Sequence, residues 1–222
     1  MELVAARSST ARRDLVCAAA GLVVALAATW ALSVLRLQGA WALPLAYLAA
    51  WVPMIAAVVV ACLPRGPRIR SAWRLASARL GLRFGLFDVF WGIAAGCLAR
   101  AFDASVNLLL HGSTGLAPQP TLGAPAGIGV LVLAFLAPVL LAPVIEEVFF
   151  RGLLQRSLVS VLGERRPRLG AAVLGVIVAS AVFALMHVVG AGPQALIGTF
   201  FFGLLAGTLT AATGRIGGAV VA

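Results

Sequence analysis

The sequence is a series of apolar runs, each about twenty residues or longer, separated by short polar or arginine-bearing stretches. A helix of about 20 apolar residues crosses the ~30 Å hydrocarbon core of a bilayer. Backbone groups in hydrocarbon must be satisfied within the chain, so such runs predict membrane-spanning helices. Only 11% of the residues are charged, against roughly 25% in soluble domains. A water-soluble globule is therefore excluded.

The runs predict an all-α, polytopic membrane helix bundle in a single transmembrane domain, residues 1–222. The pattern gives about six complete spans and the start of a seventh after Thr213-Gly214. The fourth span is interrupted by Pro138 and Pro143 and is too long for one perpendicular crossing. The predicted spans are, in order, residues 15–35, 41–63, 86–110, 128–162, 169–189 and 195–212.

The basic residues, all arginine, number 17 against seven acids, for a net charge of +10. In a membrane protein this balance indicates arginine-rich cytoplasmic loops facing anionic lipid, with no nucleic-acid partner. Arginine-bearing and arginine-poor loops alternate along the chain, which predicts a cell-membrane protein with a cytoplasmic N-terminus. Residues 14–83 would form two N-terminal helices and a basic cytoplasmic loop, part of it along the membrane surface. The absence of lysine, with abundant Ala and Arg, suggests a bacterial source.

The predicted fourth span holds two adjacent carboxylates, Glu146 and Glu147, among apolar neighbours. Two buried like charges side by side are costly unless their roles differ. Arg151 lies four residues after Glu147 on the same helical face, so it can hold Glu147 ionised and oriented. Glu146 points about 100° away and lacks a charged partner in its helix, as a desolvated general base would. We assign Glu147 to structure and Glu146 to chemistry; the alternative is that both acids pair structurally with arginines.

His187, near the end of the predicted fifth span, is the second candidate. A lone histidine in a membrane is usually a hydrogen-bonding residue without catalytic function. If the fourth and fifth spans form a hairpin about residues 164–168, however, Glu146 lies level with His187, and Phe150 lies level with Phe183. A carboxylate and an imidazole at one level can converge on a water molecule, provided that the helix rotations agree.

Other residues are predicted to support the site structurally. Gly203 and Gly207, four residues apart in the predicted sixth span, allow close helix approach. Together with Arg151, Phe150 and Phe183 they form the predicted structural support of the candidate catalytic set.

Three ionisable residues fall in the predicted third span. Arg100 and Asp103 are three residues apart and can pair on one face. Asp88, near the cytoplasmic end, is expected to be interfacial. His111, in the following loop, is expected to be solvated.

The order Glu146-Glu147-x-x-x-Arg151-Gly152, then Phe183-x-x-x-His187, then a glycine-bearing helix resembles the CPBP family of intramembrane endopeptidases. This family includes type II CAAX prenyl endopeptidases and Abi proteins linked to bacteriocin processing or self-immunity. The resemblance implies a catalytic core at residues 126–222 that hydrolyses a peptide bond in a membrane-bound protein or peptide. It implies Glu146, Glu147 and His187 as catalytic residues, with Glu146 activating water and His187 assisting.

The resemblance leaves the cofactor open. The family has been described both as metalloproteases and as metal-free, glutamate-dependent enzymes. If Zn²⁺ is used, Glu146 and His187 are its expected ligands, whereas a catalytic zinc usually takes three protein ligands.

The family's fourth motif, His-x-x-x-Asn or Asp, is expected at about the end of this sequence, and its histidine is missing. We expect truncation rather than lost competence, because the apolar run stops in mid-membrane. The main alternative function is a catalytically inactive membrane protein of the same fold, acting in self-immunity or as a scaffold. A small transporter is disfavoured, because the chain has neither an inverted repeat nor paired broken helices.

Overall fold

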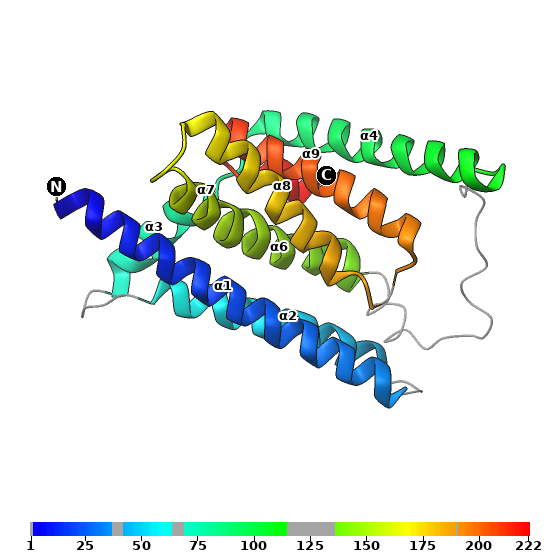
Figure 1. Cartoon of the computed structure of the whole chain (residues 1–222), viewed down its shortest axis with the longest axis horizontal. Coiled ribbons are helices and arrows are strands. Elements are labelled where there is room, and N and C mark those ends of the chain that lie inside the picture. Colours follow the sequence, from blue (N-terminus) through cyan, green and yellow to red (C-terminus); the bar gives the residue numbers. More distant parts are fainter. Residues whose placement is uncertain (1, 37–41, 64–68, 115–135, 190) are drawn as a thin grey trace.

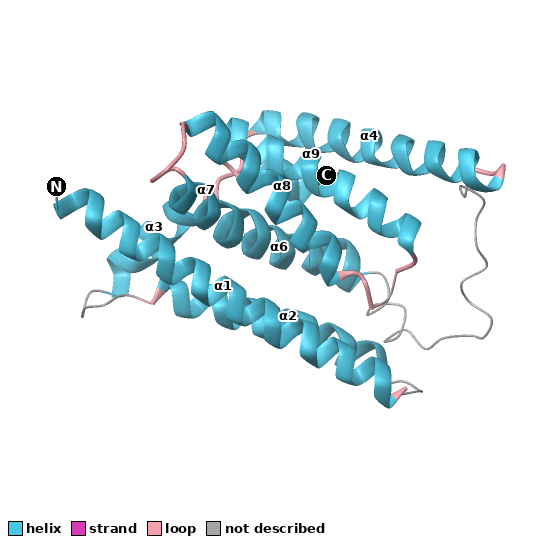
Figure 2. Ribbon diagram, in the orientation of Figure 1, coloured by secondary structure: helices cyan, strands magenta, loops and turns pink. Residues whose placement is uncertain are grey.

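The structure is a computed structural model that describes residues 2–36, 42–63, 69–114, 136–189 and 191–222. Throughout these ranges the chain forms helices joined by short loops, and they contain no β-strand (Figure 2). The predicted all-α membrane bundle is therefore confirmed.

Among the residues that the structure describes, five helices are long and apolar enough to cross a membrane. They agree with the predicted first, second, third, fifth and sixth spans, and α1 continues further toward the N-terminus than the first span predicts. The five are α1 (Glu2–Leu35), α2 (Ala42–Cys62), α4 (Leu86–His111), α8 (Arg168–Met186) and α9 (Pro193–Thr213). Two short helices complete them, α3 (Ile69–Leu80) in the basic stretch and α10 (Gly217–Val221) at the end.

The predicted fourth span is a continuous helical segment whose pitch changes along its length. Its described part consists of η1 (Ala137–Leu141), α6 (Ala142–Glu147), η2 (Val148–Gln155) and α7 (Arg156–Leu162), in which η1 and η2 are π-helical. Residues 128–135 lie outside the described part. Pro138 and Pro143 lack the N–H that a regular α-helix uses, and wide π-helical turns accommodate such interruptions. The sequence did not predict these wide turns.

This segment occupies the middle of the bundle (Figure 1). In Figure 1, α1 and α2 run side by side along the lower edge, α4 along the upper edge, and the central segment lies between them with α8 and α9. The segment formed by α6 and η2 contacts α1, α2, α3, α8, α9 and α10. The largest buried apolar side chains include Phe149, Phe150 and Leu153 of η2. We call this central segment, η1 to α7, the motif helix, because it carries Glu146, Glu147 and Arg151. Most of the other helices pack around it.

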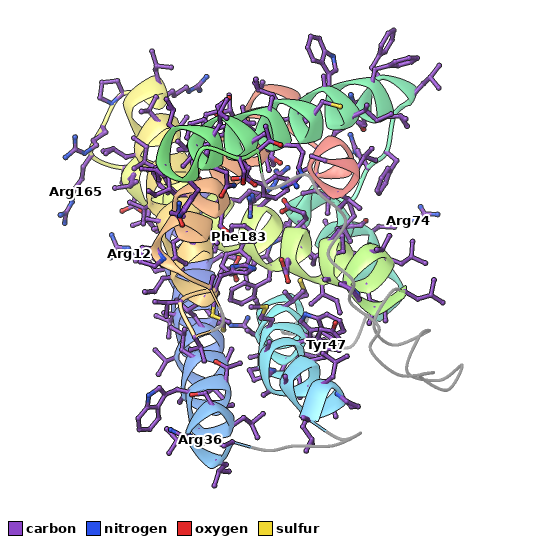
Figure 3. The ribbon with its side chains drawn as sticks, turned by 90° about the vertical axis from the view of Figure 1, so that its right-hand side faces the viewer. Arg12, Arg36, Tyr47, Arg74, Arg165 and Phe183 are labelled. Atoms are coloured by element: carbon purple, nitrogen blue, oxygen red, sulfur yellow. The ribbon has the colours of Figure 1, made fainter. Side chains whose placement is uncertain are left out.

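Ion pairs join distant arginine-bearing segments at one end of the bundle. Arg12 Nη2 lies 2.7 Å from Glu164 Oε2, and Arg79 pairs with Asp14. Arg36 lies at the other end of α1, away from Arg12 (Figure 3). The N-terminal helix, the basic stretch and the turn before α8 therefore share one end, in agreement with the predicted alternation of loops.

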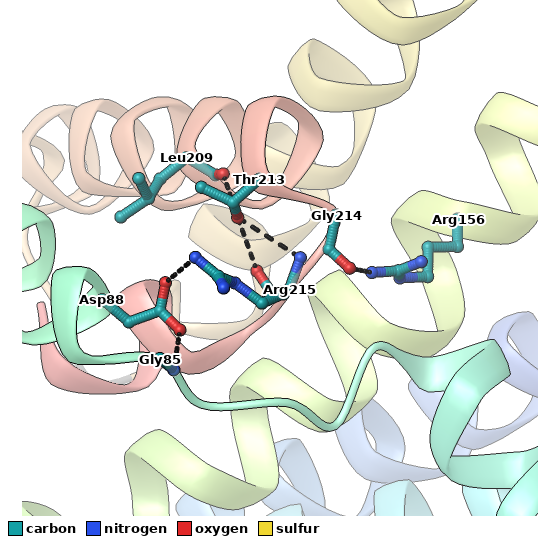
Figure 4. Close-up of polar contacts among 7 residues, drawn as sticks. All are labelled: Gly85, Asp88, Arg156, Leu209, Thr213, Gly214 and Arg215. Carbon is teal, nitrogen blue, oxygen red and sulfur yellow. Dashed lines mark hydrogen bonds and ion pairs between the residues drawn. The ribbon is translucent and has the colours of Figure 1, made fainter.

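Asp88 lies in the first turn of α4, near the end of the span, and it is buried within the protein. Its residue is fully buried (0% exposed), and its Oδ1 lies 3.0 Å from Arg215 Nη2. Its Oδ2 accepts a hydrogen bond of 2.6 Å from the Gly85 amide. Next to this pair, Arg156 Nη2 donates to the Gly214 carbonyl at 2.7 Å (Figure 4). These contacts fasten the turn before α10 to α4 and to α7, and local sequence patterns do not reveal partners so far apart.

We predict that Asp88→Asn destabilises the bundle, because Arg215 loses its anionic partner. Removing one member of a fully buried pair costs about 3–5 kcal/mol. The Arg215 side chain is 35% exposed, so we expect a smaller loss of about 1–3 kcal/mol. The measurement is the thermal unfolding midpoint in detergent.

Asp103→Asn is the matched control on the same helix. The Asp103 side chain is 37% exposed and lies 3.7 Å from Arg100, as the sequence predicts. Exposed pairs contribute little, so this variant should unfold close to the wild-type midpoint. Equal decreases of the unfolding midpoint in the two variants would show that the burial of Asp88 does not add to the stability of the bundle.

Candidate active site

A buried ion pair organises the motif helix. Arg151 Nε lies 3.2 Å from Glu147 Oε2, and the two side chains are only 1% and 3% exposed. Arg151 also contacts two neighbouring helices, because its Cζ lies 4.6 Å from the centre of the Phe183 ring and its Nη2 donates to the Gly203 carbonyl at 3.5 Å. The guanidinium thus links η2 to α8 and α9. The predicted Glu147–Arg151 pair is present.

The residues predicted as structural support meet around this arginine. The Phe150 and Phe183 rings lie 5.1 Å apart and nearly perpendicular, a favourable aromatic geometry. The contact places Phe150 level with Phe183, as the predicted hairpin of the fourth and fifth spans requires. Figure 3 shows Phe183 at the centre of the bundle. A Cβ on Gly203 would lie 2.9 Å from the Ser180 Cβ, so the close approach of α8 and α9 requires glycine there.

Gln155 is a buried polar residue that sequence reasoning missed. It is 2% exposed, and its Nε2 donates to the Gly207 carbonyl at 2.9 Å. A signal was available, since Glu147, Arg151 and Gln155 recur at intervals of four and form one polar stripe. Arg151 and Gln155 both donate to α9 carbonyls, at Gly203 and Gly207. The predicted glycines therefore also offer backbone acceptors to the motif helix.

Glu146 has a different environment from Glu147. Its residue is half-buried and lies near the Trp51 side chain. His187 and Arg151 both lie close enough to interact with it electrostatically, whereas the ion pair of Arg151 is made with Glu147. The structure thus brings Glu146 and His187 together, as the hairpin geometry predicted. Sequence reasoning missed Trp51, which belongs to a different span.

The hydrogen bond of His187 selects the tautomer of its neutral ring. Nδ1 lies 2.9 Å from the Phe183 carbonyl oxygen. A carbonyl can only accept, so Nδ1 carries the proton and Nε2 of the neutral ring presents a lone pair. His187 also lines a pocket of about 550 Å³ between α1, α2 and the end of α8. Tyr47, Thr29 and Ser33 line the same pocket.

The described residues do not form a three-ligand metal site. Within the described ranges, no group of three or more His, Cys, Asp or Glu side chains is close enough to hold a metal ion. Glu146 and His187 could supply two ligands, while the third nearby acid, Glu147, is engaged by Arg151. A catalytic zinc usually takes three protein ligands, so the residues present do not fit a zinc site.

His111 lies outside this cluster. It is exposed, as expected, and its Nδ1 lies 3.1 Å from Nε2 of the Gln194 side chain.

Residues 128–222 match the family model described as type II CAAX prenyl endopeptidase Rce1-like. We call this matched part the Rce1-like segment, after the family to which it is similar. The match confirms the resemblance predicted from the two motifs, and it includes the motif helix, α8, α9 and α10. The helices α1 to α4 precede the matched segment. Comparison with curated proteins and with solved structures gave no match.

We predict that Arg151→Met destabilises the protein by about 3–5 kcal/mol, because it leaves Glu147 buried and unpaired. Adding Glu147→Gln should restore part of the loss, since the double variant buries no charge. The measurement is a double-mutant cycle on thermal unfolding in detergent, with Glu147→Gln as the other single variant. Strictly additive losses would contradict the coupling of the two residues.

Proposed function

We propose that the protein is an intramembrane endopeptidase that hydrolyses a peptide bond in a membrane-associated protein or peptide. The observation that carries this proposal is the division between two adjacent acids. Glu147 is paired with Arg151, while Glu146 lies beside Trp51 and His187. One acid is thereby neutralised and fixed, and its neighbour remains able to accept a proton. The match of residues 128–222 to an endopeptidase family supports the same reaction class.

In the proposed mechanism Glu146 is the general base. It takes a proton from a water molecule as the water oxygen bonds to the carbonyl carbon of the substrate. His187 Nε2 accepts a hydrogen bond from the same water and orients it. The tetrahedral intermediate collapses when the C–N bond breaks, and protonated Glu146 returns its proton to the leaving nitrogen. The electrostatic interaction between Glu146 and His187 supports these steps.

The membrane environment and the substrate follow from the same arrangement. The five apolar helices place the protein in a bilayer, and the positive-inside rule puts the arginine-rich end, with the N-terminus, in the cytoplasm. The pocket beside His187 is lined mainly by apolar side chains, which suits a hydrophobic peptide. A prenylated C-terminal peptide and an unmodified membrane peptide are both candidate substrates.

We predict that Glu146→Gln lowers kcat by about 10²–10⁴-fold, because glutamine cannot accept the proton of water. The assay uses full-length protein in proteoliposomes with two fluorogenic probes, a farnesylated Cys-a-a-X peptide and an unmodified apolar peptide. Cleavage is measured at saturating probe to separate kcat from KM.

Glu164→Gln is the control, because Glu164 pairs with Arg12 at the arginine-rich end and should leave kcat unchanged. Undiminished cleavage by Glu146→Gln would remove Glu146 from the mechanism. If wild-type protein binds a probe without cleaving it and Glu146→Gln binds equally well, a non-catalytic binding protein is indicated instead.

A further inference from the structure

A second cavity, of about 840 Å³, lies at the arginine-rich end of the bundle. Its walls come from α1, α2, α3 and the motif helix, and the charged residues that line it are Asp14, Arg79 and Arg156. Pockets that bind small ligands have volumes of about 300–1,000 Å³. Neither Glu146 nor His187 lines this cavity, so it is distinct from the pocket of the candidate active site.

The cavity lies at the depth of lipid headgroups. The part of α1 that is apolar enough to cross a membrane begins at Ser9, and Asp14 follows within about one and a half helical turns. α2 ends at Cys62, which lines the same cavity. α3, at the same end of the bundle (Figure 1), contributes Leu75 and Arg79. With 12 residues α3 is too short to span the hydrocarbon core. The cavity is therefore placed where phosphate groups of the bilayer lie.

The charges around the cavity favour an anion. Arg79 pairs with Asp14, so these two charges offset each other. Arg156 makes no ion pair with any carboxylate of the described residues, although its side chain is partly buried. Its Nη2 donates to the Gly214 carbonyl (Figure 4), and a guanidinium has further N–H donors. One positive charge at the cavity thus remains without a counter-charge.

The other walls of the cavity are largely apolar. Leu75 of α3 lines it and is 64% exposed, and Leu80 and Leu153 line it from α3 and the motif helix. A free anion bound to Arg156 would leave these leucines against water. An amphiphile would place its anionic group at the guanidinium and its chains along the leucines. Basic pockets between spanning helices, at the end that bears the positive loops, bind anionic lipid headgroups in this way.

We propose that this cavity binds the phosphate of an anionic phospholipid from the leaflet at the arginine-rich end. Arg156 donates hydrogen bonds to the phosphate oxygens, and the acyl chains lie against Leu75 and its apolar neighbours. The bound lipid would contact α1, α3 and the motif helix together and so stabilise their packing. The inference goes beyond the proposed reaction and does not depend on it.

The test separates the phosphate from the chains. Purified full-length protein in a neutral maltoside detergent is titrated with dioctanoyl phosphatidylglycerol, with dioctanoylglycerol, which lacks the phosphate, and with inorganic phosphate, which lacks the chains. The measurement is the thermal unfolding midpoint, because a ligand that binds only the folded protein raises it. We expect a saturable rise with phosphatidylglycerol, and about tenfold or weaker binding of each of the other two probes.

Arg156→Gln should weaken binding of phosphatidylglycerol about ten- to hundredfold, the range expected for losing a hydrogen bond between charged groups. Arg165→Gln is the matched control, since Arg165 is an exposed arginine at the same end (Figure 3). It removes the same charge outside the cavity and should bind phosphatidylglycerol as wild type does, because exposed charges are screened by salt.

Ser160→Trp decides the matter even if Arg156→Gln fails to fold. Ser160 is exposed and lines the cavity, so tryptophan there fills the space and leaves Arg156 in place. It should abolish the saturable rise. Wild-type affinity in Ser160→Trp, an equal loss in Arg165→Gln, or no saturable rise in the wild type overturns the site.

Two further outcomes would overturn the lipid as its occupant. Inorganic phosphate that binds as tightly as phosphatidylglycerol would assign the cavity to free phosphate. Displacement of phosphatidylglycerol by an apolar peptide with a free C-terminal carboxylate, but not by the same peptide as its amide, would assign the cavity to a peptide terminus. Phosphatidylglycerol binding that neither probe reproduces, lost in Ser160→Trp and kept in Arg165→Gln, is the result that the lipid site requires.

Discussion

The buried guanidinium of Arg151 is the constraint on which the rest of this bundle depends. A cation in the middle of a membrane protein is costly unless several groups share its charge. Here a carboxylate, an aromatic face and a backbone carbonyl do so, from Glu147, Phe183 and Gly203. These partners belong to the motif helix, α8 and α9, so satisfying one charge fixes the mutual positions of three helices. Close α8–α9 packing at Gly203 follows from the same need.

The division of labour between the two acids is a consequence of this arrangement. Adjacent residues on a helix face different directions, and Arg151 can form its close ion pair with only one of them. Glu147 takes that position because the spacing of four places it over Arg151. Glu146 lies near Trp51 of α2 and interacts electrostatically with the His187 imidazole at the end of α8. A structural ion pair on one face thus leaves a basic carboxylate on the next.

Local periodicity was enough to predict much of this. Apolar run lengths gave five spans close to their observed bounds, and hairpin geometry gave the Phe150–Phe183 contact and brought Glu146 to His187. The failures share a cause. The pairing of Asp88 with Arg215 was missed because the two residues are distant in sequence, and the π-helical turns were missed because run lengths do not specify helical pitch. Trp51 was missed because the register between spans from separate halves of the chain cannot be derived from run lengths.

The N-terminal helices contribute to the surroundings of the candidate site as well as to the membrane-spanning bundle. They precede the Rce1-like segment, yet α1 and α2 both pack against η2, and α2 also contacts α6. In the proposed reaction the acid must be shielded from lipid and also accessible to its substrate. The motif helix cannot meet both needs by itself, because part of its surface faces away from α8 and α9. α2 covers part of that surface, and with α1 it lines the pocket beside His187. The candidate site residues therefore lie within the matched segment, while helices outside that segment help to build the surroundings of these residues.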